Sequence, residues 1–168
     1  MIKRSIPDLL EGRPLVSVSP DQTVRDACTV LAAHDTGAVA VMQGGKLAGI
    51  LSERDVIRKC ICAGRPTAQT AVSEIMTANP VTIRLNASVA DALQAMLDGG
   101  FRHLPVMNGP DEVAGVLAMR DIPTENRLLV ERYREYKGPP PRDALSPDMA
   151  RGKAGPSDNQ LIASDGTI

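Results

Sequence analysis

Apolar and polar positions follow two different periods along this chain, and these periods come in a fixed order. A short β-branched run at residues 16–18 predicts a strand. The next apolar residues fall at i, i+3, i+4 and i+7, which is the spacing of one helix face; they are Val24, Ala27, Cys28 and Leu31. Two apolar runs at residues 38–42 and 47–51 then flank a Gly-Gly turn and predict a hairpin. A second helix is expected to begin near Ser52.

The whole pattern occurs twice, which indicates an internal duplication. A strand run at residues 81–83 repeats the first one at an offset of 65 positions. The second helix stripe consists of Val89, Ala92, Leu93 and Met96. A second hairpin is expected over residues 103–107 and 113–117, with one extra residue in its turn. Asp121 therefore repeats Asp55 at an offset of 66, near the start of the last helix of its copy.

Each copy thus has the order β-α-β-β-α, and a single copy would leave one apolar face of a thin sheet exposed. We therefore expect an α+β fold in which the two copies pack through their sheets as a pseudo-twofold module. The expected organisation is an N-terminal arm (1–14), a first copy (15–65), a second copy with its preceding linker (66–125), a C-terminal helix (126–138) and a flexible tail (139–168). The tail has too few large apolar residues to fold alone.

The composition of the chain argues against several classes of function. The 168 residues suffice for one domain with a core or for two very small domains. Because 19 basic residues face 20 acidic ones, no overall field points to nucleic acid or to an anionic membrane. Aromatic residues make up 2%, so platforms for stacking bases are lacking. With no apolar run of about 20 residues and no signal-peptide core in the first 14, we expect a cytoplasmic protein.

The cysteines do not predict a disulfide framework or a metal site. Three cysteines cannot pair evenly, and in a reducing compartment we expect thiols. Cys60 and Cys62 could form half of a metal site. The only histidines, His34 and His103, are not spaced as metal ligands that would complete it. No metal is therefore expected.

Several segments together resemble a known family. Residues 49–59 are similar to the end of a cystathionine-beta-synthase (CBS) motif, and residues 101–106 resemble its hairpin strand. Residues 70–77 with 79–82 are typical of the join between paired motifs. Over residues 6–125, the chain resembles a tandem CBS pair, or Bateman module, of the kind found as small stand-alone bacterial proteins.

The resemblance implies a fold, a ligand and a role. Two CBS motifs pack into a module with two clefts, and two modules usually form a flat disk-like homodimer. The family's ligands are AMP, ADP, ATP, NAD(H) or S-adenosylmethionine, held by the adenosine part. The implied function is a non-catalytic regulatory module that acts in trans on an unidentified protein target, with no nucleic acid and no membrane as partner.

Ser52 and Asp55 have two compatible interpretations. A Ser-x-x-Asp sequence at a helix start is a capping box, in which the hydroxyl accepts a backbone hydrogen bond. The same helix start presents unpaired N–H groups and a partial positive charge, which suit phosphate. In the family, the aspartate matching Asp55 accepts hydrogen bonds from both ribose hydroxyls, and the hydroxyl matching Ser52 lies beside phosphate. In the second copy Asp121 keeps the ribose position, but Ala118 replaces the hydroxyl.

The remaining candidates surround these two helix starts. Arg102 and His103 match positions that contact phosphates in the family; otherwise they are a solvent-facing arginine and a hydrogen-bonded core histidine. Arg54 and Arg120 precede the two aspartates and either add charge to the clefts or lie on the surface. The resemblance also places strand residues around the adenine, by backbone groups or aliphatic contact; these are Ser17, Val18, Ile50, Thr82, Ile83, Pro105 and Val116.

Two other classes of function compete with nucleotide sensing. A dimerisation or partner-docking scaffold with vestigial pockets would have no need for acceptor aspartates and a cation around one cleft. An enzyme is disfavoured, because the sequence has no Ser-His-Asp or Cys-His arrangement, P-loop or dinucleotide fingerprint. We therefore expect no catalytic residues and no catalytic cofactor.

Overall fold

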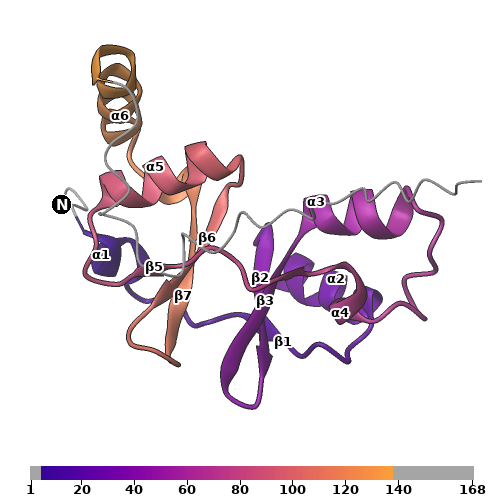
Figure 1. Ribbon diagram of the computed structural model, residues 1–168. Helices are drawn as coiled ribbons and strands as arrows, with labels where there is room; N and C mark the ends of the chain where they lie inside the picture. The colour runs from indigo at the N-terminus through magenta and orange to yellow at the C-terminus, as the bar shows by residue number, and fades with distance from the viewer. Residues whose placement is uncertain (1–4, 138–168) are drawn as a thin grey trace, which may run out of the picture.

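Two sheets stand side by side in the computed structural model, which describes residues 5–137, and helices lie on the outer sides of both (Figure 1). The first half contains α1 (Ile6–Leu10), β1 (Ser17–Val18), α2 (Val24–Ala33), β2 (Ala38–Gln43), β3 (Lys46–Ser52), α3 (Glu53–Asp55), the π-helix η1 (Val56–Ile61), α4 (Val72–Ile75) and β4 (Thr77–Ala78). The second half contains β5 (Ile83–Arg84), α5 (Val89–Gly99), β6 (His103–Met107), β7 (Val113–Ala118), the 3-10 turn η2 (Met119–Asp121) and α6 (Thr124–Lys137).

The two sheets have the same core of three strands. In the first, β1 pairs in parallel with β2, and β2 pairs with β3 as an antiparallel hairpin. In the second, β5 pairs in parallel with β6, and β6 pairs with β7 as a hairpin. The first sheet gains a fourth strand, β4, which comes from the linker and pairs with β3. The expected α+β fold with two β-α-β-β-α copies is therefore confirmed.

Each copy has its own hydrophobic core, because alternate strand residues face the helices of the same copy. In β3, Leu51 is fully buried in the core of the first copy, whereas its neighbour Ile50 is buried outside that cluster. The other face of β2 presents the small buried residues Ala38 and Ala40. Since β2 lies against β7 of the second copy, these small side chains let the two sheets approach closely.

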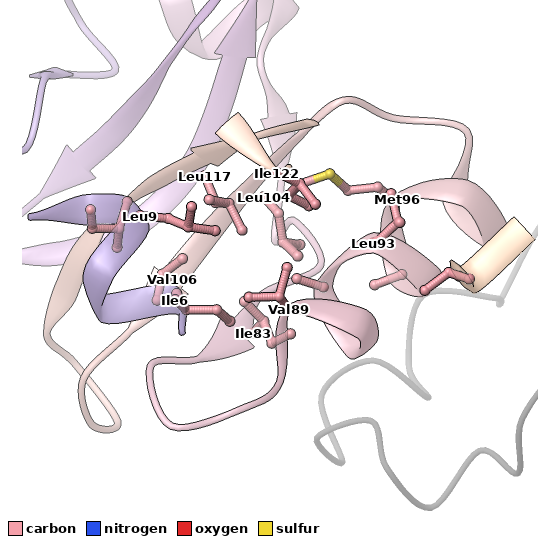
Figure 2. Packing of buried hydrophobic residues seen from close by; sticks show 14 residues of the cluster. Ile6, Leu9, Ile83, Val89, Leu93, Met96, Leu104, Val106, Leu117 and Ile122 are labelled. Carbon is pink, nitrogen blue, oxygen red and sulfur yellow. The ribbon is translucent and has the colours of Figure 1, made fainter. Parts of the chain in front are cut away.

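The N-terminal arm belongs to the core of the second copy, which the sequence analysis did not predict. Ser5 caps α1, its hydroxyl accepting from Asp8 N at 3.3 Å. Figure 2 shows Ile6 and Leu9 projecting into the cluster that contains Leu117 and Val106. Both α1 residues are at most 2% exposed, so the arm is packed and fixed in place.

The last helix begins later than expected. The sequence predicts a start near Asp121, but residues Met119–Asp121 form only a 3-10 turn and α6 begins at Thr124. The cause is Pro123, since the residue before a proline is pushed into extended conformations; Ile122 has φ −76° and ψ 125°. The helix expected over 126–138 is the body of α6, and the tail expected over 139–168 lies outside the described residues. Among residues 5–137, no helix has both the length and the apolar character needed to cross a membrane.

Candidate functional site

The start of α3 positions Asp55 directly after the buried strand β3. Ser52 is the N-cap, and its hydroxyl accepts from Asp55 N at 3.2 Å. In return, Asp55 Oδ2 accepts from Ser52 N at 3.0 Å and from the Ser52 hydroxyl at 2.6 Å. The predicted capping box is confirmed. It turns the carboxylate back over the helix N-terminus, and only 14% of the Asp55 side chain is exposed.

A lysine that the sequence analysis did not single out holds the other oxygen of this carboxylate. Lys59 Nζ lies 2.7 Å from Asp55 Oδ1, one turn along the same helical segment. It also donates to the carbonyl of Ile75 at 3.1 Å and approaches Thr77 Oγ1 at 3.5 Å. Asp55 is thereby linked through one ammonium group to the segment that joins the two copies.

The matching aspartate of the second copy has a different set of partners. Asp121 Oδ2 accepts from Ala118 N at 2.9 Å, which preserves one half of the capping box although Ala118 has no hydroxyl. The same oxygen forms an ion pair with Arg13 Nη1 at 2.7 Å. The Asp121 side chain is 7% exposed and that of Arg13 48%. A cation from the N-terminal arm therefore covers this carboxylate.

Arg54 and Arg120 make reciprocal contacts between the copies. Arg54 Nη1 donates to the carbonyl of Gly100 at 3.3 Å, and Arg120 Nη2 donates to the carbonyl of Asp35 at 2.7 Å. Gly100 and Asp35 are equivalent residues at the ends of α5 and α2, both with positive φ (68° and 47°). A cation is favourable at a helix C-terminus. Both arginines are thus exposed residues with a partner in the other copy.

His103 lies across the boundary between the copies. A Cβ added to Gly37 would stand 3.0 Å from His103 Nε2 and 3.5 Å from Glu53 Oε2, so the ring and this carboxylate both border Gly37. Burial lowers the pKa of His103, and Arg120 lowers it further, against the opposing effect of Asp121 and Glu53; nearby Arg102 also lowers it. His103 is half-buried, whereas Arg102 is exposed.

The predicted adenine-contacting strand residues divide between two faces. Ser17 of β1 and Ile50 of β3 lie in one cross-strand row, because each pairs with Ala40. Val18 and Ile83 point into the cores of their own copies, so only their backbone groups are available to a ligand. The others lie on or next to the second sheet: Val116 opposite the buried Pro105, and Thr82 half-buried just before β5.

A hollow of about 520 Å³ opens at the opposite end of the hairpins from Asp55. Its lining includes Leu15, Met42 and the turn at residues 108–112. Lys46 and Asp111 bridge the two hairpin tips at 3.2 Å. Since the hollow contains none of the predicted site residues, it is separate from the candidate clefts.

The three cysteines are thiols. Cys28 is half-buried, Cys60 buried and Cys62 exposed. Burial raises the pKa of Cys28, so its reactive thiolate is disfavoured. In the part of the chain that the structure describes, no three His, Cys, Asp or Glu side chains come together as a metal cluster.

The structure brings Arg13, Lys59 and Glu53 to the site, and sequence reasoning assigned none of them a role. Lys59 had a local signal, because a lysine four residues after an aspartate on a helix forms an ion pair. Glu53 lies at the first position of α3. Arg13 had no such signal, since its partner is 108 positions away.

Comparison with known proteins identifies the family of the duplicated unit. The family model described as "CBS domain" matches residues 8–61 and 72–123. CBS domain-containing protein YhcV of Bacillus subtilis is 34% identical over 108 residues, which cover 64% of this chain and 76% of YhcV. The mitochondrial CBS domain-containing protein CBSX3 of Arabidopsis thaliana is 37% identical over 120 residues; these cover 68% of this chain but only 56% of CBSX3.

A solved structure extends the likeness to the fold. The CBS domain protein PAE2072 of Pyrobaculum aerophilum, solved in complex with AMP, superposes with a TM-score of 0.67 at 28% identity; the match covers 76% of this chain and 96% of that protein. Two separate matches to one family, on the two halves that the structure shows to be equivalent, mean that the duplicated unit is that family's domain. The chain belongs to the CBS domain family and carries a tandem pair of these domains.

Proposed function

We propose that this protein binds an adenosine-containing ligand at Asp55 and acts in trans as a non-catalytic regulatory module. The observation that carries the proposal is the Asp55 carboxylate, which is held mostly buried over a helix N-terminus. The AMP bound to PAE2072 supports the ligand class. AMP, ATP, NAD(H) and S-adenosylmethionine all contain the ribose that this carboxylate would recognise.

The contacts of Asp55 suggest how a ribose would enter. Three donors occupy its oxygens: Ser52 N, the Ser52 hydroxyl and Lys59 Nζ. A carboxylate offers about four acceptor positions, so one remains open. A ribose hydroxyl can also replace the Ser52 hydroxyl, which then turns toward a phosphate. The ion pair between Lys59 and Asp55 Oδ1 need not break in this exchange.

Phosphate would be attracted by the cations at the boundary between the copies. The lowered pKa of His103 keeps its ring neutral at pH 7, so Arg102 and Arg120 supply the positive charge there. Glu53 opposes them, because its carboxylate borders the same glycine as the His103 ring. We therefore expect a modest gain in affinity from phosphate groups rather than a large one.

Calorimetric titration with AMP and adenosine tests the site. Asp55→Asn removes a charge-assisted acceptor, so affinity for both ligands should fall by roughly 10- to 150-fold, equivalent to about 1.5–3 kcal/mol. Arg102→Ala should weaken AMP but hardly affect adenosine. His103→Ala should act on AMP chiefly at acidic pH, since only the protonated ring brings charge.

Asp91→Asn provides a matched control. Ser88 and Asp91 form the same capping box at the start of α5, with the hydroxyl 2.7 Å from Asp91 Oδ2, but they lie outside the proposed site. This variant should lose a similar capping interaction and bind AMP normally. In a thermal-shift panel, a ligand at 100 times its Kd adds about 2.7 kcal/mol. If AMP, ATP, NADH and S-adenosylmethionine all leave the melting temperature unchanged, the proposal fails.

We also propose that the protein is a homodimer, because the second helical segment of each copy exposes large aliphatic side chains. Ile57 and Ile61 of η1 are each 55% exposed, and Leu128 and Leu129 of α6 are 55% and 66% exposed. Apolar groups on the last helical segment of both copies fit a symmetric interface with a second chain.

Light scattering at tens of micromolar protein tests the dimer. The wild type should have twice the chain mass of 17.8 kDa, and Ile57→Asp with Leu128→Asp should shift it toward the monomer. Arg84→Asp, at the exposed position of β5, is the control and should leave the dimer intact. A wild-type monomer under these conditions would rule out the proposed dimer.

A further inference from the structure

Asp55 and Asp121 each form an ion pair, but the two cations come from different parts of the chain. Lys59 belongs to the helical segment that Asp55 begins, so the pair is local. Arg13 comes from the N-terminal arm and reaches Asp121 across 108 positions of sequence. The duplication therefore did not create this second contact, and it makes the second cleft unlike the first.

Packing of the N-terminal arm on the core of the second copy holds Arg13 near Asp121. Leu10, three residues earlier, is buried in the core of the second copy and lies against Gly115 of β7. The arm then turns back, with Arg13 N donating to the carbonyl of Leu10 at 3.0 Å. Because α1 fixes the backbone at this point, the guanidinium needs only its own side-chain rotamer to reach Asp121.

Arg13 restricts access to Asp121, because its guanidinium covers a carboxylate that is only 7% exposed. Asp121 Oδ2 accepts from both Ala118 N and Arg13 Nη1, which uses the two lone pairs of that oxygen. At Asp55, the donor that a ribose would replace is the neutral Ser52 hydroxyl, which can rotate toward another acceptor. At Asp121, the replaceable donor is a charged guanidinium, and breaking such a pair is harder.

We infer that Arg13 gates the second cleft by competing with ribose hydroxyls for Asp121, so that the protein binds its ligand first at Asp55. This inference rests on the proposed function, since it takes the ligand to contain adenosine. Linkage makes the competition reciprocal: a ligand that does enter the second cleft releases Arg13 and loosens the N-terminal arm.

Titration with AMP in an Asp55→Asn background isolates the second cleft. Adding Arg13→Gln to this background should raise affinity by roughly 10- to 150-fold, the range for loss of one charge-assisted hydrogen bond. Adding Asp121→Asn as well should abolish the gain. Arg25→Gln, an exposed arginine on α2 of the first copy, is the control and should change nothing. Circular dichroism is used to check that each variant folds. Arg13→Lys is a second, milder variant.

The outcomes separate this inference from the proposed function. If Arg13→Gln leaves the affinity of the Asp55→Asn protein unchanged or lowers it, Arg13 does not gate the cleft and the inference is overturned, even where the wild type binds AMP through Asp55. If the wild type does not bind AMP but Arg13→Gln binds it in an Asp121-dependent way, the gate stands and the Asp55 proposal fails. Absence of binding in all variants overturns both.

Discussion

Equivalent glycines in the two copies allow a matched test of packing. Gly49 of β3 and Gly115 of β7 occupy the same position of the repeat, but different groups cover them. A Cβ at Gly49 would stand 2.8 Å from the backbone carbonyl of Thr77 and 2.7 Å from the sulfur of Met76. A Cβ at Gly115 would meet only the Leu10 side chain, at 3.2 Å or more.

These distances give different expected costs for alanine. At Gly49, the carbonyl belongs to β4, so the strand must move; overpacking of this kind costs about 1–3 kcal/mol. Replacing glycine also stabilises by about 0.4–1 kcal/mol through the unfolded chain. The net loss for Gly49→Ala is therefore about 1–2 kcal/mol, which corresponds to roughly 2–8 °C in melting temperature. For Gly115→Ala, a small shift of Leu10 removes most of the cost, and stability should stay within about 1 kcal/mol of the wild type.

Urea unfolding followed by far-ultraviolet circular dichroism measures both variants. The comparison is controlled internally, because both substitutions add one methyl group to a buried strand glycine of the same fold. If Gly49→Ala is as stable as the wild type, or if Gly115→Ala is the more destabilised of the two, the argument from the rigid carbonyl and the flexible side chain is wrong.

Two further predictions concern the ends of the strands. Burial lowers the pKa of His103, so on acidification the unfolded chain binds a proton at this residue before the folded protein does. The free energy of unfolding should therefore fall as the pH decreases below about 6.5. His103→Gln should flatten this dependence in urea unfolding measured between pH 5 and 7. Ser52→Ala should cost about 1 kcal/mol by removing the N-cap hydroxyl, whereas Ser52→Thr should cost much less in thermal unfolding. A pH profile unchanged by the first substitution, or a neutral Ser52→Ala, would contradict the respective reasoning.

Local patterns allowed most of the fold to be predicted. The helix stripes led by Val24 and Val89 are buried as expected, except for the half-buried Cys28, because the period of a helix decides which residues share a face. The Ser52–Asp55 capping box is also a property of four consecutive residues. A signal for α1 was present as well: Ser5 and Asp8 form a capping box, with Pro7 in the first turn.

The partners of the candidate site were harder to predict, because they depend on how the two copies and the arm pack together. Nothing in the sequence near Arg13 shows that it meets Asp121. Likewise, the contact of His103 with Gly37 is set by the approach of the second sheet to the first. The late start of α6 followed from a local rule, the effect of Pro123 on Ile122, which outweighs the apparent helix start at Asp121.

The reciprocal contacts of Arg54 and Arg120 indicate how a tandem pair of CBS domains can arise from a single domain. In a symmetric dimer every contact occurs twice, since a residue that touches the partner is touched in turn by its own counterpart. Arg54 with Gly100 and Arg120 with Asp35 obey this rule inside a single chain. One ancestral motif that paired with itself would already have had this contact, so fusing two copies required no new interface. The tandem chain is, in this sense, a dimer whose subunits became free to diverge, and the Ser52 and Ala118 positions show that they have done so.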